Sequence, residues 1–297
     1  MKKNLTKPRI NVFLAILLII LALYLLSLIF LLGWGLLKSL QDKVDYIMQG
    51  ASASSFPKSF TLSNYVSAFK ELKLKLGVEF GGRPVYFGEM LFNSLVYSIS
   101  CAVVSTLSPC IMGYLTVRIR TNFNKLINGI FYFCLLVPVF GAMPSMIQMM
   151  TSLRLINTLV GAIVMKMGFT GTYFLIFQAS FRSLSGEYAE AAKIDGANRY
   201  QIMFGIEFQL VKTIIMISFV LDFIGFWNDY QTPMIYMPNH PTAAYGLWRM
   251  NSRASSYTDY VIFKVAGFMI LIFPTFVLFM FFKDAMIGNL TIGGLKG

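Results

Sequence analysis

The sequence predicts an all-α membrane protein with six transmembrane helices. Of its 297 residues, 57% are hydrophobic and only 13% are charged, and the mean hydropathy is +0.67. An ordinary soluble domain carries about a quarter of its residues as charges. The chain therefore lacks the polar residues that a water-soluble fold of this size needs, whereas its long charge-free runs suit helices that cross a bilayer.

The first three predicted spans are runs of 28 residues without Asp, Glu, Lys or Arg, at 10–37, 90–117 and 126–153. At about 1.5 Å per residue, each exceeds the roughly 30 Å hydrocarbon core. The first run follows four basic residues, as a signal peptide would, but a signal peptide has only about 7 to 15 apolar residues before its cleavage site. We therefore expect an uncleaved first helix.

The remaining three spans are less uniform. A fourth run, 155–181, is interrupted only by Lys166, and a fifth, 213–236, carries two aspartates. The sixth run, 265–282, has 18 residues, near the lower limit for a span, but it contains six phenylalanines and no charge.

Basic residues predict the orientation of these spans. With the N-terminus inside, the inner segments hold 13 Lys or Arg in 63 residues and the outer segments hold 10 in 85. Excess cations favour the cytoplasmic side, so both termini are expected inside. The predicted organisation is a cytoplasmic N-terminus (1–9), a first helix (10–37), an extracytoplasmic loop (38–89), a membrane core (90–282) with a cytoplasmic loop (182–212), and a cytoplasmic tail (283–297).

The composition argues against several classes of function. The net charge of +12 would suggest nucleic-acid binding in a soluble protein, but no basic stripe is interleaved with stacking aromatics. No Gly-x4-Gly-Lys-Ser/Thr phosphate loop occurs in the sequence, and the single histidine, His240, has no catalytic constellation near it. The spacing of Cys101, Cys110 and Cys134 matches neither a metal site nor a redox pair, so we expect buried free thiols.

The loop 182–212 is too polar to span and should form short amphipathic helices. Within it, residues 187–197 combine strong helix formers, Ala and Glu, with a Glu190–Lys193 pair three positions apart on one face. Gly196 can end the helix where a left-handed residue is needed. The adjacent alanines would let another backbone approach, and Glu190 would offer a carboxylate to a cationic partner. By composition alone, an ordinary solvated surface helix is the better fit.

These residues resemble the signature loop of the permease subunits of ATP-binding-cassette (ABC) importers, which reads Glu-Ala-Ala, three residues, Gly, nine residues, Ile, any residue, Leu, Pro. The chain matches at Glu190, Ala191, Ala192, Gly196 and Ile206. The Leu and Pro of the signature fall on Phe208 and Gln209. Losing a helix-interrupting proline predicts a more continuous join between this loop and the fifth span.

The resemblance covers nearly the whole chain and is closest to the carbohydrate branch, in the type of the smaller maltose-importer permease. Its supporting segments are Asn93-Ser94-Leu95, Pro144, Asn157-Thr158, Trp227-Asn228-Asp229-Tyr230 and the Gly-rich ending 292–297. Each segment is short, but their order and spacing are similar to those of the family.

The resemblance implies the type I ABC importer architecture, with a cytoplasmic coupling helix between helices 4 and 5. It implies a bacterial inner-membrane subunit that performs no catalysis and binds no cofactor, while partner subunits hydrolyse ATP with Mg. Those partners would be a second permease, two ATPases and an extracytoplasmic binding protein. The residues implied in ATPase coupling are Glu190, Ala191, Ala192, Asp195, Gly196 and Ala197.

Charges inside the predicted membrane core give a second candidate site. Asp222 and Asp229 are seven residues apart and would share one face of the fifth helix. Lys166 would lie at about the same depth as Asp229 and can pair with it. We expect Asp222, Asn228, Asp229 and Lys166 to line a path for a hydroxyl-rich solute. The alternative is a structural ion pair with a snorkelling lysine.

Three classes of function follow. The first is an importer permease for sugars or oligosaccharides, or for another small polar solute. The second, an ATP-independent secondary carrier, is disfavoured because such carriers commonly show internal repeats and this sequence shows none. The third, a membrane enzyme, would need convergent catalytic groups. The identity of the solute does not follow from the sequence.

Overall fold

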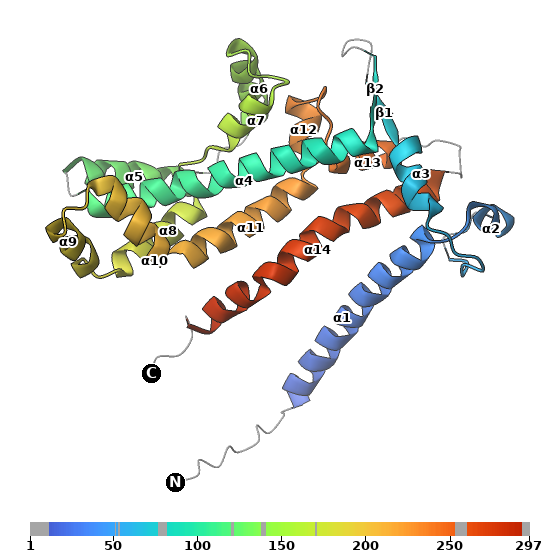
Figure 1. The fold of residues 1–297 in the computed structure, drawn as a ribbon, viewed down its shortest axis with the longest axis horizontal. Helices are drawn as coiled ribbons and strands as arrows, with labels where there is room; N and C mark the ends of the chain where they lie inside the picture. Colours follow the sequence, from blue (N-terminus) through green and yellow to red (C-terminus); the bar gives the residue numbers. More distant parts are fainter. Residues whose placement is uncertain are drawn as a thin grey trace, which may run out of the picture. The chain divides into compact units, whose positions relative to one another are not determined.

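The computed structural model describes residues 12–50, 52, 54–76, 82–119, 122–137, 141–169, 171–252 and 260–292 (Figure 1). The chain divides into two compact units. Unit 1 comprises Met1–Leu72 and Ala254–Ile270, and unit 2 comprises Lys73–Arg253 and Leu271–Gly297. The predicted N-terminus 1–9 and the residues 293–297 of the Gly-rich ending lie outside the described residues.

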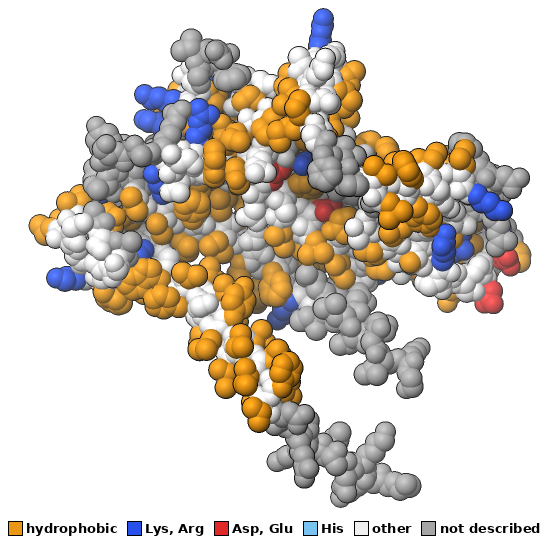
Figure 2. Space-filling model, turned by 180° about the vertical axis from the view of Figure 1, so that it is seen from behind, with side chains coloured by type: hydrophobic (Ala, Val, Ile, Leu, Met, Phe, Trp, Pro, Cys, Tyr) orange, Lys and Arg blue, Asp and Glu red, His pale blue; other side chains and the backbone are white. Residues whose placement is uncertain are grey.

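Unit 1 contains α1 (Val12–Ser39), α2 (Lys43–Met48), α3 (Ser63–Glu71) and the first turns of α14 (Tyr260–Ile292). The apolar side chains of α1 are almost all exposed, as expected of a helix whose solvent is lipid. Hydrophobic side chains likewise cover much of the molecular surface in Figure 2, and acidic ones are few.

A buried lysine organises the polar segment that follows α1. The Lys38 ammonium donates to Gln41 Oε1 at 3.0 Å, to the Ser52 carbonyl at 3.2 Å and to the Ser55 carbonyl. Its positive charge also lies 5.5 Å from the centre of the Trp34 ring. These bonds satisfy the charged donor and hold Gln41, Ser52 and Ser55 around the end of α1. The sequence shows this segment only as polar.

Unit 2 is mainly helical, in agreement with the predicted fold class, and it also contains one small hairpin that was not predicted. Strands β1 (Lys73–Lys75) and β2 (Pro84–Tyr86) pair antiparallel, with Leu74 opposite Val85 and both side chains buried. The helices are α4 (Phe87–Arg118), α5 (Asn122–Leu136), α6 (Ala142–Ser152), α7 (Leu159–Lys166), α8 (Thr172–Ser183), α9 (Glu187–Ile194), the π-helix η2 (Gln201–Glu207), α10 (Phe208–Leu210), α11 (Lys212–Asn228), α12 (Gln231–Tyr236) and α13 (Ala243–Ser252).

Helix α4 is the centre of unit 2. It packs along α8 and α11, with the β-hairpin near its first residue and α9 near its last (Figure 1). Gly113 allows the close approach to α8, because a Cβ there would lie 3.0 Å from the backbone nitrogen of Gln178. The buried residues of unit 2 therefore gather along α4.

Among the described residues, three single helices are long and apolar enough to cross a membrane: Val12–Ser39, Phe87–Arg118 and Val261–Asp284. A fourth candidate is the pair Gln201–Leu210 and Lys212–Asn228, which is bent by 76°. The described helices agree with the predicted first, second and sixth spans, but they do not confirm the count of six.

The third and fourth predicted spans are each divided into two helices. Residues 126–153 contribute to α5 and α6, and residues 155–181 contribute to α7 and α8. Helix α6 begins after Gly141, whose φ is +70°, and α8 begins after Gly171, whose φ is +133°. Glycine adopts such angles without the steric cost that a Cβ imposes, so these positions let the chain turn inside an apolar run.

The fifth predicted span, 213–236, ends early. Helix α11 stops at Asn228, and the Asp229 carboxylate then accepts a bond from the Thr232 backbone N–H at 3.0 Å, near the start of α12. Pro233 follows in the first turn of α12, where a missing N–H is tolerated. The run is therefore mostly apolar but is not one helix.

The expected continuous join before the fifth span is also absent. The 76° bend lies at Val211, which has φ −104° and ψ 8°. Val211 is buried against aromatic side chains of α8 and α10, so packing holds the bend without the proline of the family signature. The cysteines were partly mispredicted as well: Cys101 and Cys110 are buried, but Cys134 is exposed on α5.

Candidate functional site

Two regions of unit 2 carry the residues that the sequence singled out. The first, the α9 protrusion, comprises residues 187–197. The second, the polar cluster, comprises Tyr97, Lys166, Asp229 and Thr232.

The α9 protrusion folds as its composition predicts. Helix α9 ends at Ile194, and Gly196 has φ +83°. The Gly196 N–H donates to the Lys193 carbonyl at 3.1 Å, and the Ala197 N–H donates to the Ala192 carbonyl at 2.9 Å. This pair of bonds is the Schellman arrangement, which satisfies carbonyls at the end of a helix. The predicted helix stop at Gly196 is confirmed.

Most of the six residues expected to couple to an ATPase are accessible. Glu190, Ala191, Asp195 and Gly196 are exposed, and Ala197 is half-buried. Ala192 is buried and lies on the face turned toward the rest of unit 2. The side chain of Ile194 is 86% exposed, so the protrusion presents apolar as well as acidic groups.

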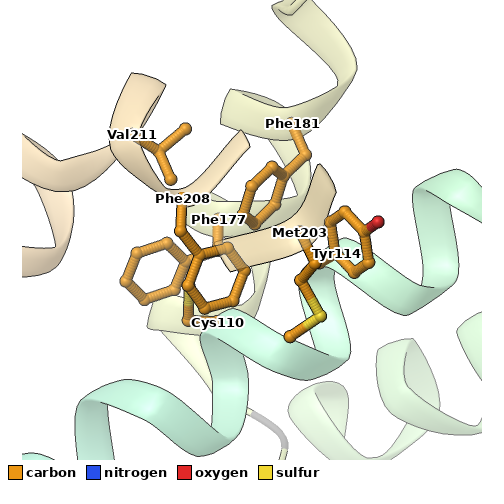
Figure 3. Packing of buried hydrophobic residues seen from close by; sticks show 7 residues of the cluster. All are labelled: Cys110, Tyr114, Phe177, Phe181, Met203, Phe208 and Val211. Atoms are coloured by element: carbon orange, nitrogen blue, oxygen red, sulfur yellow. The ribbon is translucent and has the colours of Figure 1, made fainter. Parts of the chain in front are cut away.

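The base of the protrusion is a cluster of buried side chains from α4, α8, η2 and the residues that follow it, which we call the aromatic cluster. Figure 3 shows its seven members converging. Phe181 lies at the centre, with its ring 5.5 Å from that of Tyr114 and 5.8 Å from that of Phe208. The members are Cys110, Tyr114, Phe177, Phe181, Met203, Phe208 and Val211.

A buried ion pair adjoins the aromatic cluster. Arg118 Nε lies 2.8 Å from Glu207 Oε2, and the Glu207 side chain is only 2% exposed. The pair joins the last residue of α4 to the last residue of η2. Sequence reasoning missed it, although Arg118 is the first charge after a 28-residue apolar run and Glu207 is the last carboxylate of the polar loop.

The polar cluster contains the ion pair that the sequence predicted. Lys166 Nζ lies 3.7 Å from Asp229 Oδ2, which also accepts a hydrogen bond from the Tyr97 hydroxyl at 2.9 Å. Lys166 Nζ donates to Thr232 Oγ1 at 3.1 Å. Four elements, α4, α7, the α11–α12 turn and α12, therefore meet at one charge pair.

Asp222 lies apart from this ion pair, because it is within α11, whereas Asp229 follows the last residue of that helix. Asp222 Oδ2 accepts from Thr106 Oγ1 at 3.5 Å and also interacts with Ser105 and Tyr173. The last two residues line a cavity of about 400 Å³ together with Pro109, Gly168, Gly171 and Thr172.

Asn228, the remaining candidate, is exposed and donates its amide to the Ile224 carbonyl of its own helix at 2.8 Å. The partners Tyr97, Thr106, Tyr173 and Thr232 were not foreseen, because uncharged polar residues inside apolar runs give no periodic signal. In the described part of the chain, no three His, Cys, Asp or Glu side chains come together as metal ligands.

Comparison with known proteins gives a family match. Residues 91–290 match the model of the family described as "Binding-protein-dependent transport system inner membrane component". A chain of a bacterial ABC transporter involved in the import of the acidic polysaccharide alginate superposes with a TM-score of 0.71 over 95% of this chain and 99% of that chain. The identity is 18%, so this likeness shows the fold alone.

Three curated relatives are transport permeases. AraQ, an arabinooligosaccharide transport permease of Halalkalibacterium halodurans, is 26% identical over 88% of this chain and 89% of its own. MelC, a melibiose/raffinose/stachyose import permease of Bacillus subtilis, is 23% identical over 87% of this chain and 88% of its own. UgpE, an sn-glycerol-3-phosphate transport permease of Yersinia enterocolitica, is 29% identical over 66% of this chain and 70% of its own.

Proposed function

Because the chain belongs to the family of binding-protein-dependent transport system inner membrane components, we propose that it is a permease subunit of an ATP-driven importer for sugars or oligosaccharides. Likeness to AraQ and MelC over almost nine-tenths of the chain carries this proposal. The chain is then a multi-pass membrane subunit and not an enzyme. Likeness to UgpE favours a second candidate, a permease for a small phosphorylated or otherwise polar solute.

Six membrane crossings fit this function if each divided run counts as one span. The pairs α5–α6 and α7–α8 would supply the third and fourth crossings, in addition to the helices that are long enough by themselves. The density of Lys and Arg supports a cytoplasmic location for both termini and for the α9 protrusion.

The α9 protrusion is proposed as the coupling helix. Its exposed face, with Glu190, Ala191, Asp195, Gly196 and Ala197, would enter a cleft on a cytoplasmic ATPase, while Ala192 secures it to unit 2. Two such ATPases would hydrolyse ATP with Mg, and a second permease would complete the pathway. The family description refers to a binding protein, and an external protein of this kind would deliver the solute.

The aromatic cluster suits the transmission of that movement. Large rings that interlock cannot slide freely, since a packed core is bistable and not continuously deformable. Displacement of α9 and η2 would therefore carry α4 and α8 along with it. Asp222, Lys166, Asn228 and Asp229, with their hydroxyl partners, are proposed to line the path that this motion opens and closes.

The partnership is tested by purifying the complex through this chain. We expect a second permease, an ATPase and a binding protein to copurify, and the binding protein can then be screened against saccharides and glycerol phosphate. A chain that purifies without an ATPase under mild conditions would contradict the proposal.

The coupling face is tested by substitutions that keep the chain folded. Gly196→Asp and Ala191→Trp should lower solute-stimulated ATP hydrolysis, because both change the exposed face. Ala192→Trp should also lower it, but by displacing α9 within unit 2, so it is expected to reduce thermal stability as well. Gly205→Asp, at an exposed glycine of η2, is the matched control. Normal stimulation in the first two variants would refute the assignment.

The path residues are tested with Asp229→Asn. A carboxylate that bonds a solute should be worth about 1.5–3 kcal/mol, so uptake should fall about tenfold or more while the complex stays assembled. Asp284→Asn, which removes an exposed carboxylate of α14, is the control. If Asp229→Asn lowers stability but leaves uptake intact, the ion pair is structural and the path role fails.

A further inference from the structure

A second cavity of unit 2 lies beneath the α9 protrusion and has no role in the proposed transport path. Its volume is about 540 Å³. Its walls come from the end of α4, from α9, and from the helical segment that begins at Arg199 and continues into η2. The charged residues in its lining are Arg118, Lys193, Arg199 and Glu207.

The lining has an excess of positive charge. Glu207 is already paired with Arg118, and among the described residues neither Lys193 nor Arg199 forms an ion pair. The other carboxylates of the protrusion, Glu187, Glu190 and Asp195, do not line the cavity. Two exposed cations without an ion-pair partner therefore line one cavity.

Arg118 contributes a third cation to the lining and contains a buried donor without an acceptor. Its Nε donates to Glu207, but its Nη2 is buried without a hydrogen-bond partner among the described residues. Only two other buried side-chain atoms there lack a partner, and neither belongs to a charged group. An unsatisfied charged donor is costly, and a guanidinium matches the oxygens of a phosphate in a two-pronged arrangement.

The backbone around the cavity is also unusual. Asn198 and Gln201 cap the helix reciprocally, with the Gln201 N–H donating to Asn198 Oδ1 at 2.9 Å and the Asn198 N–H donating to Gln201 Oε1 at 2.7 Å. The chain then winds as a π-helix for seven residues. Segments of this kind are rare and frequently mark functional sites, and this one turns Ile202, Met203 and Glu207 toward the interior.

We propose that this cavity binds a phosphate-bearing anion. The cations would contact the phosphate, while Leu115, Ile119 and Ile202 would lie against an apolar remainder. The phosphate could belong to an anionic phospholipid of the inner leaflet, whose headgroups bind basic pockets at the cytoplasmic ends of membrane helices, or to a soluble phosphate compound. The cytoplasmic position rests on the proposed orientation, but the binding itself does not. A bound anion would contact both α9 and the end of α4 and so make the α9 protrusion more rigid.

The test uses the full chain in neutral detergent at constant ionic strength. Inorganic phosphate is titrated by calorimetry, and phosphatidylglycerol is compared with phosphatidylcholine by native mass spectrometry, which counts the lipid molecules retained. Lys193→Gln/Arg199→Gln removes two exposed cations of the cavity and leaves the Arg118–Glu207 pair intact. The control Arg182→Gln/Lys212→Gln removes two exposed cations that do not line it.

We expect at least one probe to bind the unaltered chain, and the cavity variant to weaken that binding about tenfold or more while the control stays within about twofold. Retention of phosphatidylglycerol alone identifies the lipid, and binding of inorganic phosphate identifies a soluble ligand. The proposal is overturned if neither probe binds, or if both double variants weaken binding equally. Failure of ATP-driven uptake would leave this result untouched, so the two proposals can fail separately.

Discussion

The two ends of α4 are held by different chemistry. Near its start, Tyr97 contributes a single hydroxyl to a charge pair between Lys166 and Asp229. Near its end, Tyr114 packs into a cluster of interlocked rings, and Arg118 forms a buried ion pair with Glu207. The first end depends on a few directional bonds, whereas the second depends on packed rings and one buried ion pair.

This difference suits two separate tasks. Directional bonds can be exchanged for bonds to a passing solute at small cost, because hydrogen-bonding groups are replaced by similar ones. A packed aromatic core resists partial displacement and moves as a block. We infer that the end of α4 near α9 transmits force, while the end near Asp229 rearranges.

The largest effect is expected from Phe181→Ala at the centre of the aromatic cluster. The ring is fully buried, and its loss should cost about 3–5 kcal/mol and uncouple α9 from α4. Thermal unfolding and stimulated ATP hydrolysis of the solubilised complex measure the two consequences. Phe133→Ala, which removes a 66% exposed ring of α5, should leave both nearly unchanged. Equal effects of the two substitutions would show that the aromatic cluster does not couple α9 to α4.

The next effect concerns the buried ion pair. Arg118→Gln leaves the Glu207 carboxylate without its cation, and breaking a buried pair in this way costs about 3 kcal/mol or more. The double variant Arg118→Gln/Glu207→Gln removes both charges and should recover much of the lost melting temperature. Without such recovery, the Arg118 side chain would be stabilising the base of the protrusion through packing and not through its charge.

A smaller effect is expected at the opposite end of α4. Tyr97→Phe removes one hydrogen bond to a charged acceptor, worth about 1.5–2 kcal/mol, and keeps the ring that packs at 6.1 Å from that of Phe226. Solute uptake should change more than basal ATP hydrolysis. A larger change in basal ATP hydrolysis than in uptake would contradict the inference that this end of α4 rearranges while the other end transmits force.

The smallest effect is expected at the tip of the protrusion. Gly196→Ala places a Cβ on a residue with φ +83°, at a cost of about 1 kcal/mol, without filling any space inside unit 2. Gly205→Ala in η2 should be neutral or slightly stabilising. Melting curves of the two variants compare the costs directly, and equal curves would mean that the turn at Gly196 is not strained.

The sequence predicted local features of the fold, such as a helix end and an ion pair, better than it predicted which apolar runs form continuous helices. The helix stop at Gly196 depends on neighbouring residues and was predicted, as was the pairing of Lys166 with Asp229. The breaks within residues 126–153 and 155–181 were not predicted, because a charge-free run shows compatibility with lipid and not helical continuity. Gly141 and Gly171 were visible signals for those breaks.

The contacts that define the candidate sites were mostly beyond sequence reasoning. Arg118 and Glu207 are 89 residues apart, and Tyr97 and Asp229 are 132 apart. Nothing local to one member identifies the other, since these contacts depend on how α4 packs. The bend at Val211 was missed for the same reason. The signature proline is absent, and the bend is held by packing of Val211 in the aromatic cluster, which no local pattern reveals.

The central claim is that this chain moves solute only when an ATPase acts on the α9 protrusion. The most direct measurement is uptake of a radiolabelled sugar, chosen as a ligand of the copurified binding protein, into proteoliposomes. We predict ATP-dependent uptake by the assembled complex, and none by the complex carrying Gly196→Asp or by this chain alone. Uptake by this chain alone, in liposomes free of any ATPase, would contradict the account.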